Sequence, residues 1–317
     1  MKICIISFDS TYFDHNIALE LKRRNIDTNH IDASKFKHKY KSIFERIAIN
    51  FKNKDYKKQI KQKGLEEYIL NQLEKFGNQD SILFIRPDKV SKKTHLEIKK
   101  TTKNYLAYIY DSCNRFPIEH LLRGVFDEIF SFDIKDVKKY NFTFISNYIY
   151  MEKREVDATE LNNIIFIVIS IDERFEFLNK IAKYLSSQEI NYKFIAVGKK
   201  IPKEANRNII FSRKALLPSD LQKDFEYSKI FLDLIRKDHN GLSFRIFEAL
   251  AMQRKIITTN KSIQQYDFYN PNNILILDEN SEINISNDFL TTPYEPLDEL
   301  VYYKYTLENW VNTVFKI

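Results

Sequence analysis

Residues 240–253 have the composition of a helix that begins directly after a buried strand and can hold an anionic ligand. The stretch "NGLSFRIFEALAM" follows one apolar run and leads into another. The first backbone N–H groups of a helix lack partners within it and form the positive end of its dipole, which suits a phosphate. Gly241 permits close approach of a ligand to the backbone, and Asn240 can cap the helix. We expect Asn240, Gly241 and Ser243 to contact a phosphorylated ligand.

Arg245 and Glu248 are the charged side chains of this otherwise apolar helix. At 100° per residue they share one side of it. Arg245 can bind a diphosphate or a carboxylate through two parallel hydrogen bonds, and Glu248 can accept hydrogen bonds from sugar hydroxyls. The alternative is an exposed i,i+3 salt bridge, which would contribute about 0.2–0.5 kcal/mol.

A second polar group follows the first apolar run of the second half, in "VISIDERF" (168–175). Ser170 and Arg174 lie there between a predicted strand and a predicted helix, where open parallel sheets bind phosphates. The alternative is an ordinary strand–helix turn in which Asp172 caps the helix.

Two aspartates follow predicted strands of the first half. Asp111 lies in "IYDSCNRFP" with Arg115 nearby, and Asp9 comes after "KICIISF". A carboxylate at a strand end can serve as the base for an acceptor hydroxyl, so Asp111 is the first catalytic candidate and Asp9 the second. The alternative for both is a helix cap or turn. Cys113 has no histidine near it in sequence and is expected to be inert.

Apolar runs alternate with helical patterns along the first half. The predicted strands are 2–8, 81–87, 105–111 and 128–133, with 142–150 as a further candidate, and the helical patterns include 16–24, 65–76 and 117–124. This alternation predicts a parallel sheet wrapped by helices.

The same alternation restarts after a polar stretch over 151–163, which we interpret as a linker. The predicted strands are 164–170, 192–198, 208–211, 229–235, 255–259 and 273–278, and the predicted helices are 173–187, 218–226 and 242–253. The fold class is therefore α/β, with two Rossmann-like parallel-sheet domains facing a cleft. The expected domains are 1–150 and 151–295, followed by a helix over 296–317 that crosses back.

Composition restricts the functional class. The chain has 317 residues, 44% of them hydrophobic, and a net charge of +7. Residues 35–63 contain eleven lysines and arginines against Glu45 and Asp55, so the basic charge is local. Such a segment can lie on an anionic membrane, and the alternative is a solvated lysine-rich helix. The two cysteines favour a reducing cytoplasm, and neither a signal peptide nor a membrane span is indicated.

Neither a metal site nor a nucleic-acid module is predicted. The six histidines show no ligand spacing, D-x-D is absent, and the adjacent pairs of acidic residues point in different directions. No recognised nucleic-acid-binding motif is present, so nucleic acid is not an expected partner.

The strings "GLSFRIFEAL", "KIITTN" and "YDFYNPNNI", with "YDSCNRFP" and "FSFDIKDVKKYNF" in the first half, resemble bacterial GT-B glycosyltransferases that build lipopolysaccharide and capsule. Many members of that family carry an acidic residue, seven others, then glutamate. Here the frame reads Asn240-Gly241 through Glu248, so the first acidic position is replaced. The resemblance implies that Glu248 holds ribose or sugar hydroxyls of the donor. It also implies that no catalytic metal or other cofactor is used.

The resulting hypothesis is a cytoplasmic, metal-independent glycosyltransferase at the inner face of the membrane. The second half would bind a nucleotide-sugar donor and the first half a glycan or lipid-linked glycan acceptor. Two alternatives stay open: a sugar-nucleotide epimerase on the same architecture, and a non-catalytic sugar-nucleotide-binding partner of a glycan assembly complex.

Overall fold

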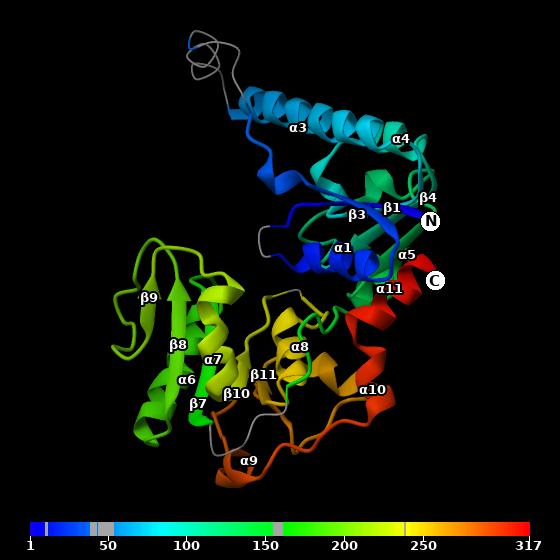
Figure 1. Ribbon diagram of the computed structural model, residues 1–317. Helices are drawn as coiled ribbons and strands as arrows, with labels where there is room; N and C mark the ends of the chain where they lie inside the picture. Colours follow the sequence, from blue (N-terminus) through cyan, green and yellow to red (C-terminus); the bar gives the residue numbers. More distant parts are fainter. Residues whose placement is uncertain (10–11, 39–42, 44–53, 155–160, 238) are drawn as a thin grey trace. The chain divides into compact units, whose positions relative to one another are not determined.

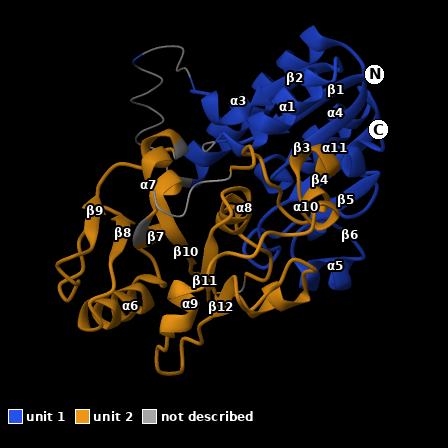
Figure 2. Cartoon of the chain, turned by 60° about the horizontal axis from the view of Figure 1, so that its bottom comes forward, with its two compact units in different colours: residues 1–145, 311–317 blue, residues 146–310 orange. Residues whose placement is uncertain are grey.

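The chain folds into two compact units. The computed structural model describes residues 1–9, 12–38, 43, 54–154, 161–237 and 239–317. Unit 1 comprises residues 1–145 and 311–317, and unit 2 comprises residues 146–310 (Figure 2). The chain therefore passes into unit 2 after Ile145 and returns to unit 1 after Trp310. The sequence-based expectation placed the first change at residue 150.

Unit 1 is built on a parallel sheet with the strand order β2-β1-β3-β4-β5-β6. The strands are β1 (Lys2–Ser7), β2 (Asp27–Asp32), β3 (Gln79–Ile85), β4 (Thr102–Ile109), β5 (Glu128–Ser131) and β6 (Thr143–Phe144). β1, β3 and the second half of β4 are buried, as expected for parallel strands covered on both faces. The chain adds β2 on one side of β1 and β3 on the other, so the strand order reverses between β1 and β3.

Helices cover both faces of this sheet. They are α1 (Phe13–Arg23), α3 (Lys54–Phe76), α4 (Lys92–Lys99) and α5 (Ile134–Tyr140), with the end of α11 (Leu307–Phe315). Figure 1 shows α3 and α4 along one face and α1 along the other. Ile69 of α3 and Ile98 of α4 pack in one core with Cys4 and Phe84 of the strands. Burial raises the pKa of the Cys4 thiol to about 12, so this cysteine is an inert core residue.

Unit 2 is built on a second parallel sheet, with the order β12-β11-β10-β7-β8-β9. The strands are β7 (Asn162–Ser170), β8 (Tyr192–Val197), β9 (Ile210–Ser212), β10 (Ser228–Asp233), β11 (Lys255–Thr258) and β12 (Ile274–Ile276). Here the strand order reverses between β7 and β10. The two parallel α/β sheets confirm the fold class that the sequence predicts.

The central strand β7 shows why the strands of unit 2 have continuous apolar sequences. The helices of this unit are α6 (Phe175–Ser187), α7 (Gln222–Tyr227), α8 (Phe244–Ala251), α9 (Asn287–Thr291) and α10 (Glu299–Lys304), with the start of α11. Ile165 and Ile167 pack in one core with residues of α6 and α9, whereas Phe166 packs in the other with residues of α7 and α8. Successive strand side chains point to opposite faces, so a strand between two helical layers needs apolar residues throughout.

Some elements differ from the sequence-based expectation. The strand β2 was not expected because its sequence, DTNHID, is mostly polar, and its pairing with β1 defines it. The helical pattern over 117–124, which begins with Pro117, forms only a 3-10 turn over Glu119–Leu121.

The expected strand over 142–150 and the expected single tail helix are both interrupted for one reason. The sheet takes only Thr143–Phe144 of the first segment, and the tail forms α10 and α11. The backbone N–H of Ile149 donates to Tyr305 O at 2.7 Å, and the N–H of Leu307 donates to Ile149 O at 2.9 Å. These bonds hold Ile149 beside the tail and separate the two tail helices.

Residues 39–42 and 44–53 of the basic segment 35–63, the predicted membrane contact, lie outside the described residues. Its C-terminal end forms the first turns of α3. Among the residues that the structure describes, no helix combines the length and the apolar character needed to cross a bilayer.

Candidate functional site

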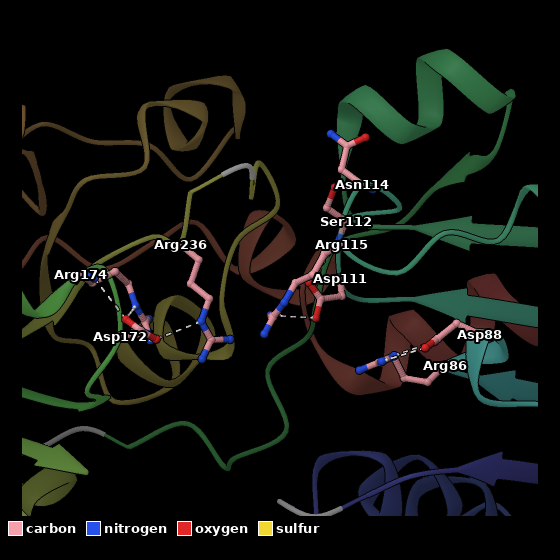
Figure 3. A network of polar contacts seen from close by, with 9 residues as sticks. All are labelled: Arg86, Asp88, Asp111, Ser112, Asn114, Arg115, Asp172, Arg174 and Arg236. Atoms are coloured by element: carbon pink, nitrogen blue, oxygen red, sulfur yellow. Dashed lines mark hydrogen bonds and ion pairs between the residues drawn. The ribbon is translucent and has the colours of Figure 1, made fainter. Parts of the chain in front are cut away.

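Two arginines and one aspartate meet at the carboxyl ends of the central strands of unit 2. Asp172 follows β7, and Arg236 follows β10, which pairs with β7. Arg174 donates from Nε and Nη2 to the two carboxylate oxygens of Asp172, at 2.8 and 2.6 Å. Nε of Arg236 lies 3.3 Å from Asp172 Oδ2 (Figure 3). We call Asp172, Arg174 and Arg236 the strand-end arginine cluster.

The strand-end arginine cluster carries a net positive charge. Burial alone would raise the pKa of Asp172, but the hydrogen bonds and charge of Arg174, with the charge of Arg236, hold it below its usual value. The carboxylate is therefore ionised and shared by two guanidinium groups, and the side chain of Arg236 is 33% exposed. The cluster lies where the strand order of the sheet reverses, which is the ligand-binding position of open α/β sheets. This arrangement suits a phosphate or diphosphate.

Gly198, at the end of β8, determines how closely the loop that carries Asp172 can pack. A Cβ atom at Gly198 would lie 2.8 Å from Ile171 Cδ1, a contact that a side chain cannot make without displacing its neighbour. The N–H of Ile171 donates to Val197 O at 2.9 Å, which fixes the loop in this position. The glycine therefore helps to place the strand-end arginine cluster.

The start of α8 is fastened to neighbouring loops. Ser243 occupies the N-cap position, and its Oγ donates to Asp233 Oδ1 at 2.7 Å instead of capping the helix. The carbonyl oxygens of Asn240 and Gly241 accept hydrogen bonds from Ser262 Oγ at 2.7 Å and Asn260 Nδ2 at 3.1 Å. The expectation that Asn240 caps the helix is wrong, because α8 begins at Phe244.

Glu248 and Arg245 point into unit 2 and contact each other. Glu248 is buried, and its Oε1 accepts a hydrogen bond from the Tyr150 hydroxyl at 2.6 Å. Its Oε2 lies 3.5 Å from Arg245 Nε, and the Arg245 guanidinium lies 5.7 Å from the ring centres of Phe166 and Phe225. The i,i+3 ion pair exists, as the alternative reading expected, but it is largely buried instead of exposed.

Tyr150 and Phe225 also line a cavity of about 200 Å³ between α7 and the end of α8. Burial, and then the charge and hydrogen bond of Glu248, raise the pKa of Tyr150, so the hydroxyl stays protonated and donates to the carboxylate. A sugar hydroxyl that bound Glu248 would share this carboxylate with Tyr150.

In unit 1, Asp111 follows β4 and contacts the loop that it begins. Its Oδ1 accepts from the N–H of Ser112 at 3.1 Å, and its Oδ2 lies 3.3 Å from Arg115 Nη1 (Figure 3). Asp111 is buried, whereas the side chain of Arg115 is 45% exposed. The structure thus brings together the two residues that the sequence singled out there.

Arg86, which the sequence analysis did not single out, lies at the end of the adjacent strand β3. It donates to both carboxylate oxygens of Asp88, at 2.8 and 2.9 Å, and its guanidinium lies 3.7 Å from the ring centre of Phe116. Its backbone has φ 64°, in the left-handed region that a residue with a Cβ seldom adopts. Its position, a charged residue between an apolar run and Pro87, was the signal that could have indicated it.

Asp9 follows β1, and Asp14 lies in the first turn of α1. Oδ2 of Asp9 accepts from the N–H of His15 at 2.8 Å in the first turn of α1, so Asp9 satisfies a helix N-terminus. Asp14 is only 2% exposed. Burial, followed by the charges of Asp9 and Asp32, raises its pKa well above the usual value. Asp14 is a buried carboxylic acid that the sequence analysis did not single out.

Comparison with known proteins shows the fold. No protein-family profile and no curated sequence matches the chain. A UDP-forming α,α-trehalose-phosphate synthase from Burkholderia xenovorans, in complex with glucose-6-phosphate, is 9% identical with a TM-score of 0.60 over 100% of this chain and 99% of that chain. The glycotransferase of kitacinnamycin is 10% identical with a TM-score of 0.50 over 99% and 98%. The chain has the GT-B fold.

The GT-B fold alone does not distinguish the reaction classes. A UDP-GlcNAc 2-epimerase from Methanocaldococcus jannaschii, in complex with UDP-GlcNAc and UDP, is 12% identical with a TM-score of 0.51 over the whole of both chains. Such identities concern the fold, so the chemistry must be argued from the side chains.

The expected donor residues of this GT-B chain fall into two groups. Arg174 belongs to the strand-end arginine cluster, and Ser170 ends β7 two residues before Asp172. Arg245 and Glu248 form the inward pair of α8. Arg236, which the sequence analysis missed, joins the first group and could have been found by examining every strand end.

No group of three or more histidine, cysteine or acidic side chains is placed to hold a metal ion, within the ranges that the structure describes. The expectation of a metal-independent reaction therefore remains a prediction for experiment.

Proposed function

We propose that this GT-B chain is a glycosyltransferase that moves a sugar from a nucleotide-sugar donor to a bacterial surface glycan, as in lipopolysaccharide or capsule synthesis. The observation that carries the proposal is the strand-end arginine cluster, at the reversal of strand order in unit 2. Two guanidinium groups that share one carboxylate leave positive charge for the donor diphosphate or monophosphate. The full-length likeness to sugar-nucleotide enzymes supports the same class of ligand.

The proposed reaction assigns separate roles to the two units. The bond between the anomeric carbon and the donor phosphate oxygen breaks, and the nucleotide leaves with the electron pair. Arg174 and Arg236 stabilise the negative charge that develops on this leaving group. A bond forms between the acceptor oxygen and the anomeric carbon, and Asp111 of unit 1 accepts the hydroxyl proton. Glu248 orients donor hydroxyls once they replace part of its hydrogen bonding to the Tyr150 hydroxyl.

The acceptor is a glycan or lipid-linked glycan, and the reaction takes place in the cytoplasm at the inner face of the membrane. The basic segment 35–63 supports this location because lysines near an anionic bilayer each contribute about 1 kcal/mol to binding. The absence of a required metal is tested by adding a chelator, which should leave transfer unchanged.

The deciding experiment compares Arg236→Ala with Arg207→Ala. Arg207 is an exposed arginine of the same unit, so both variants lose the same charge. The purified chain is incubated with UDP-, GDP-, dTDP- and CMP-sugars and an extracted surface glycan, and transfer is measured. A charge-assisted hydrogen bond contributes about 1.5–3 kcal/mol, so Arg236→Ala should lower transfer and donor affinity by tenfold or more. Equal activity of both variants would remove the proposed donor site.

An epimerase is the second candidate, because enzymes of that class share the architecture over the whole chain. Epimerisation needs no acceptor. Incubation with sugar nucleotide alone therefore distinguishes the two: a transferase leaves the sugar configuration unchanged, whereas an epimerase converts it.

A further inference from the structure

Unit 1 contains a cavity of about 750 Å³ beside the first turns of α3. Four lysines line it: Lys57, Lys58, Lys61 and Lys89. We call it the lysine cavity, and we propose that it binds an amphiphile with a phosphate head and an apolar chain. This site is distinct from the donor site of unit 2, and the proposal does not depend on the glycosyl transfer proposed above.

Among the described residues, the lysines of this cavity have no acidic partner. No described carboxylate lines the cavity, and none of the four lysines forms an ion pair with one. By contrast, Lys63 on the same helix lies 4.0 Å from Glu67. The cavity therefore gathers positive charge that the described part of the chain does not neutralise.

The arrangement of these lysines has an energetic cost in the absence of a ligand. Lys57 and Lys61 are separated by one helical turn, and Lys58 and Lys61 are three residues apart, so the like charges repel each other. Such like-charge pairs destabilise a helix. A phosphate that binds among them relieves the repulsion and accepts several hydrogen bonds.

The remaining wall of the cavity is largely apolar. Phe8, Ala33, Phe36 and Leu65 line it, and Leu65 projects from the same helix as three of the lysines. A free inorganic phosphate would leave these side chains without a partner, whereas an apolar chain attached to the phosphate would cover them. The volume lies within the range of small-molecule binding sites, about 300–1,000 Å³.

Gly64 permits the close packing that shapes this wall. A Cβ atom there would lie 3.1 Å from His38 Nδ1 and 3.2 Å from Phe36 Cζ. Glycine within a helix is less stable than alanine would be. Here it lets the segment after β2 approach α3, and Phe36 also packs against Tyr68, with ring centres 5.5 Å apart. The wall of the lysine cavity is therefore a built feature of the unit.

The test is a calorimetric titration of the full chain with dispersed farnesyl phosphate, without any sugar nucleotide. The variant Lys57→Ala/Lys58→Ala/Lys61→Ala removes three cavity lysines, and its fold should be unharmed because it relieves like-charge repulsion. The control Lys63→Ala/Lys100→Ala/Lys103→Ala removes three exposed lysines of the same unit that pair with Glu67, Glu97 and Asp80. We expect the cavity variant to bind at least tenfold more weakly and the control to bind within threefold of the wild type.

Three further ligands separate the sources of binding. Farnesol, which lacks the phosphate, and inorganic phosphate, which lacks the chain, should each bind at least tenfold more weakly than farnesyl phosphate. Vesicles of phosphatidylglycerol report on a bilayer surface. Binding to vesicles but not to farnesyl phosphate, or an equal loss in both triple variants, would overturn the proposal in favour of diffuse surface charge. Undiminished binding by the cavity variant would overturn it as well.

Arg236→Ala separates this proposal from the donor site. The variant should bind farnesyl phosphate normally, because Arg236 belongs to unit 2. If sugar transfer is found but farnesyl phosphate does not bind, only the lysine cavity proposal fails. If farnesyl phosphate binds but no sugar is transferred, only the proposed function fails.

Discussion

At the residue scale, burial of the single carboxyl group of Asp14 changes its protonation state. It is 2% exposed, and its Oδ2 has no hydrogen-bond partner among the described residues. Asp9 and Asp32 lie near enough for their charges to disfavour its ionisation further. Asp14 therefore remains protonated in the folded chain well above the pH at which an exposed aspartate loses its proton.

Replacement of Asp14 by asparagine should change the pH dependence of stability. Asp14 titrates near 3.8 in the unfolded chain and well above this value in the folded chain. Its stabilising contribution is complete below pH 3.8 and is lost as the pH rises towards the folded pKa. Asparagine does not titrate, so its variant lacks this loss. In urea unfolding at pH 5, 6 and 7, the free energy of unfolding of Asp14→Asn relative to the wild type should therefore rise by up to about 1.4 kcal/mol per pH unit. Parallel stability curves for the two chains would contradict the assignment.

The buried pair of Arg245 and Glu248 in α8 affects how a mutation of Glu248 is interpreted. Side-chain exposure is 5% for Glu248 and 15% for Arg245. Removal of the carboxylate leaves Arg245 without its counter-charge and Tyr150 without its acceptor. Loss of activity in a Glu248 variant therefore has to be separated from loss of stability.

Glu248→Ala should lower the free energy of unfolding by about 3 kcal/mol, because it breaks a largely buried ion pair. Tyr150→Phe, which removes one hydrogen bond to a charged group, should cost about 1.5 kcal/mol and serves as the matched comparison. Both are measured by urea unfolding at pH 7. A cost below about 1 kcal/mol for Glu248→Ala would show that the carboxylate is not structural and would favour a role only in ligand binding.

At the scale of elements, the loop between β7 and α6 depends on the end of β8. Gly198 provides the space that Ile171 occupies, and Ile171 directly precedes Asp172. Packing in one strand end therefore sets the position of charged groups at the next.

Gly198→Ala should destabilise the chain by about 1–3 kcal/mol, the usual range for an overpacked core. It should also weaken donor binding, because the displaced Ile171 moves the strand-end arginine cluster. Ile171→Ala in the Gly198→Ala background removes Cδ1 and Cγ1, two of the three atoms that the new Cβ would meet, and should restore most of the donor affinity. Calorimetry with the donor measures both effects, and a failure of this rescue would separate Gly198 from the cluster.

Apolar strands were predictable from the sequence because helices cover both faces of each sheet. β1 and β7 show as unbroken apolar runs for this reason. The edge strand β2 was not predictable in this way, since its pairing with β1 is a tertiary property. The break between α10 and α11 was hidden as well, because it depends on backbone hydrogen bonds to the distant Ile149.

The candidate site was predictable only in part. The rule that ligands bind at strand ends indicated Asp111 and Arg174, and the structure places each at such an end. Helical spacing grouped Arg245 with Glu248, but it could not show that both point inward, since Tyr150 lies 98 positions away from Glu248 in the sequence. Arg236 was missed because the only feature of its local sequence that indicates a role is the strand that precedes it.

At the scale of the whole molecule, unit 1 is completed by the C-terminal residues. Val311, Val314 and Phe315 are buried, and residues 311–317 belong to unit 1. Asn312 accepts a hydrogen bond from Arg24, and Lys316 pairs with Glu128 at 2.9 Å. The end of the chain is therefore part of the core of the first unit.

Deletion of residues 311–317 should lower the stability of the chain by several kcal/mol. Burial of each apolar side chain contributes at most about 1.5–3 kcal/mol to the free energy of unfolding, because the unfolded chain already buries part of its apolar surface. Lys316→Ala is the control, because its exposed ion pair should contribute at most about 1 kcal/mol. Urea unfolding measures both, and equal stability of the truncated and complete chains would contradict the role assigned to the tail.

This discontinuity has a consequence for synthesis on the ribosome. Domains generally fold as they emerge, beginning with the N-terminal one. Here the first 145 residues leave the exit tunnel without the segment that closes their core, and the 165 residues of unit 2 are translated before it arrives. Unit 2, although it is translated later, can therefore complete its fold before unit 1, whose core lacks residues 311–317 until the end of translation.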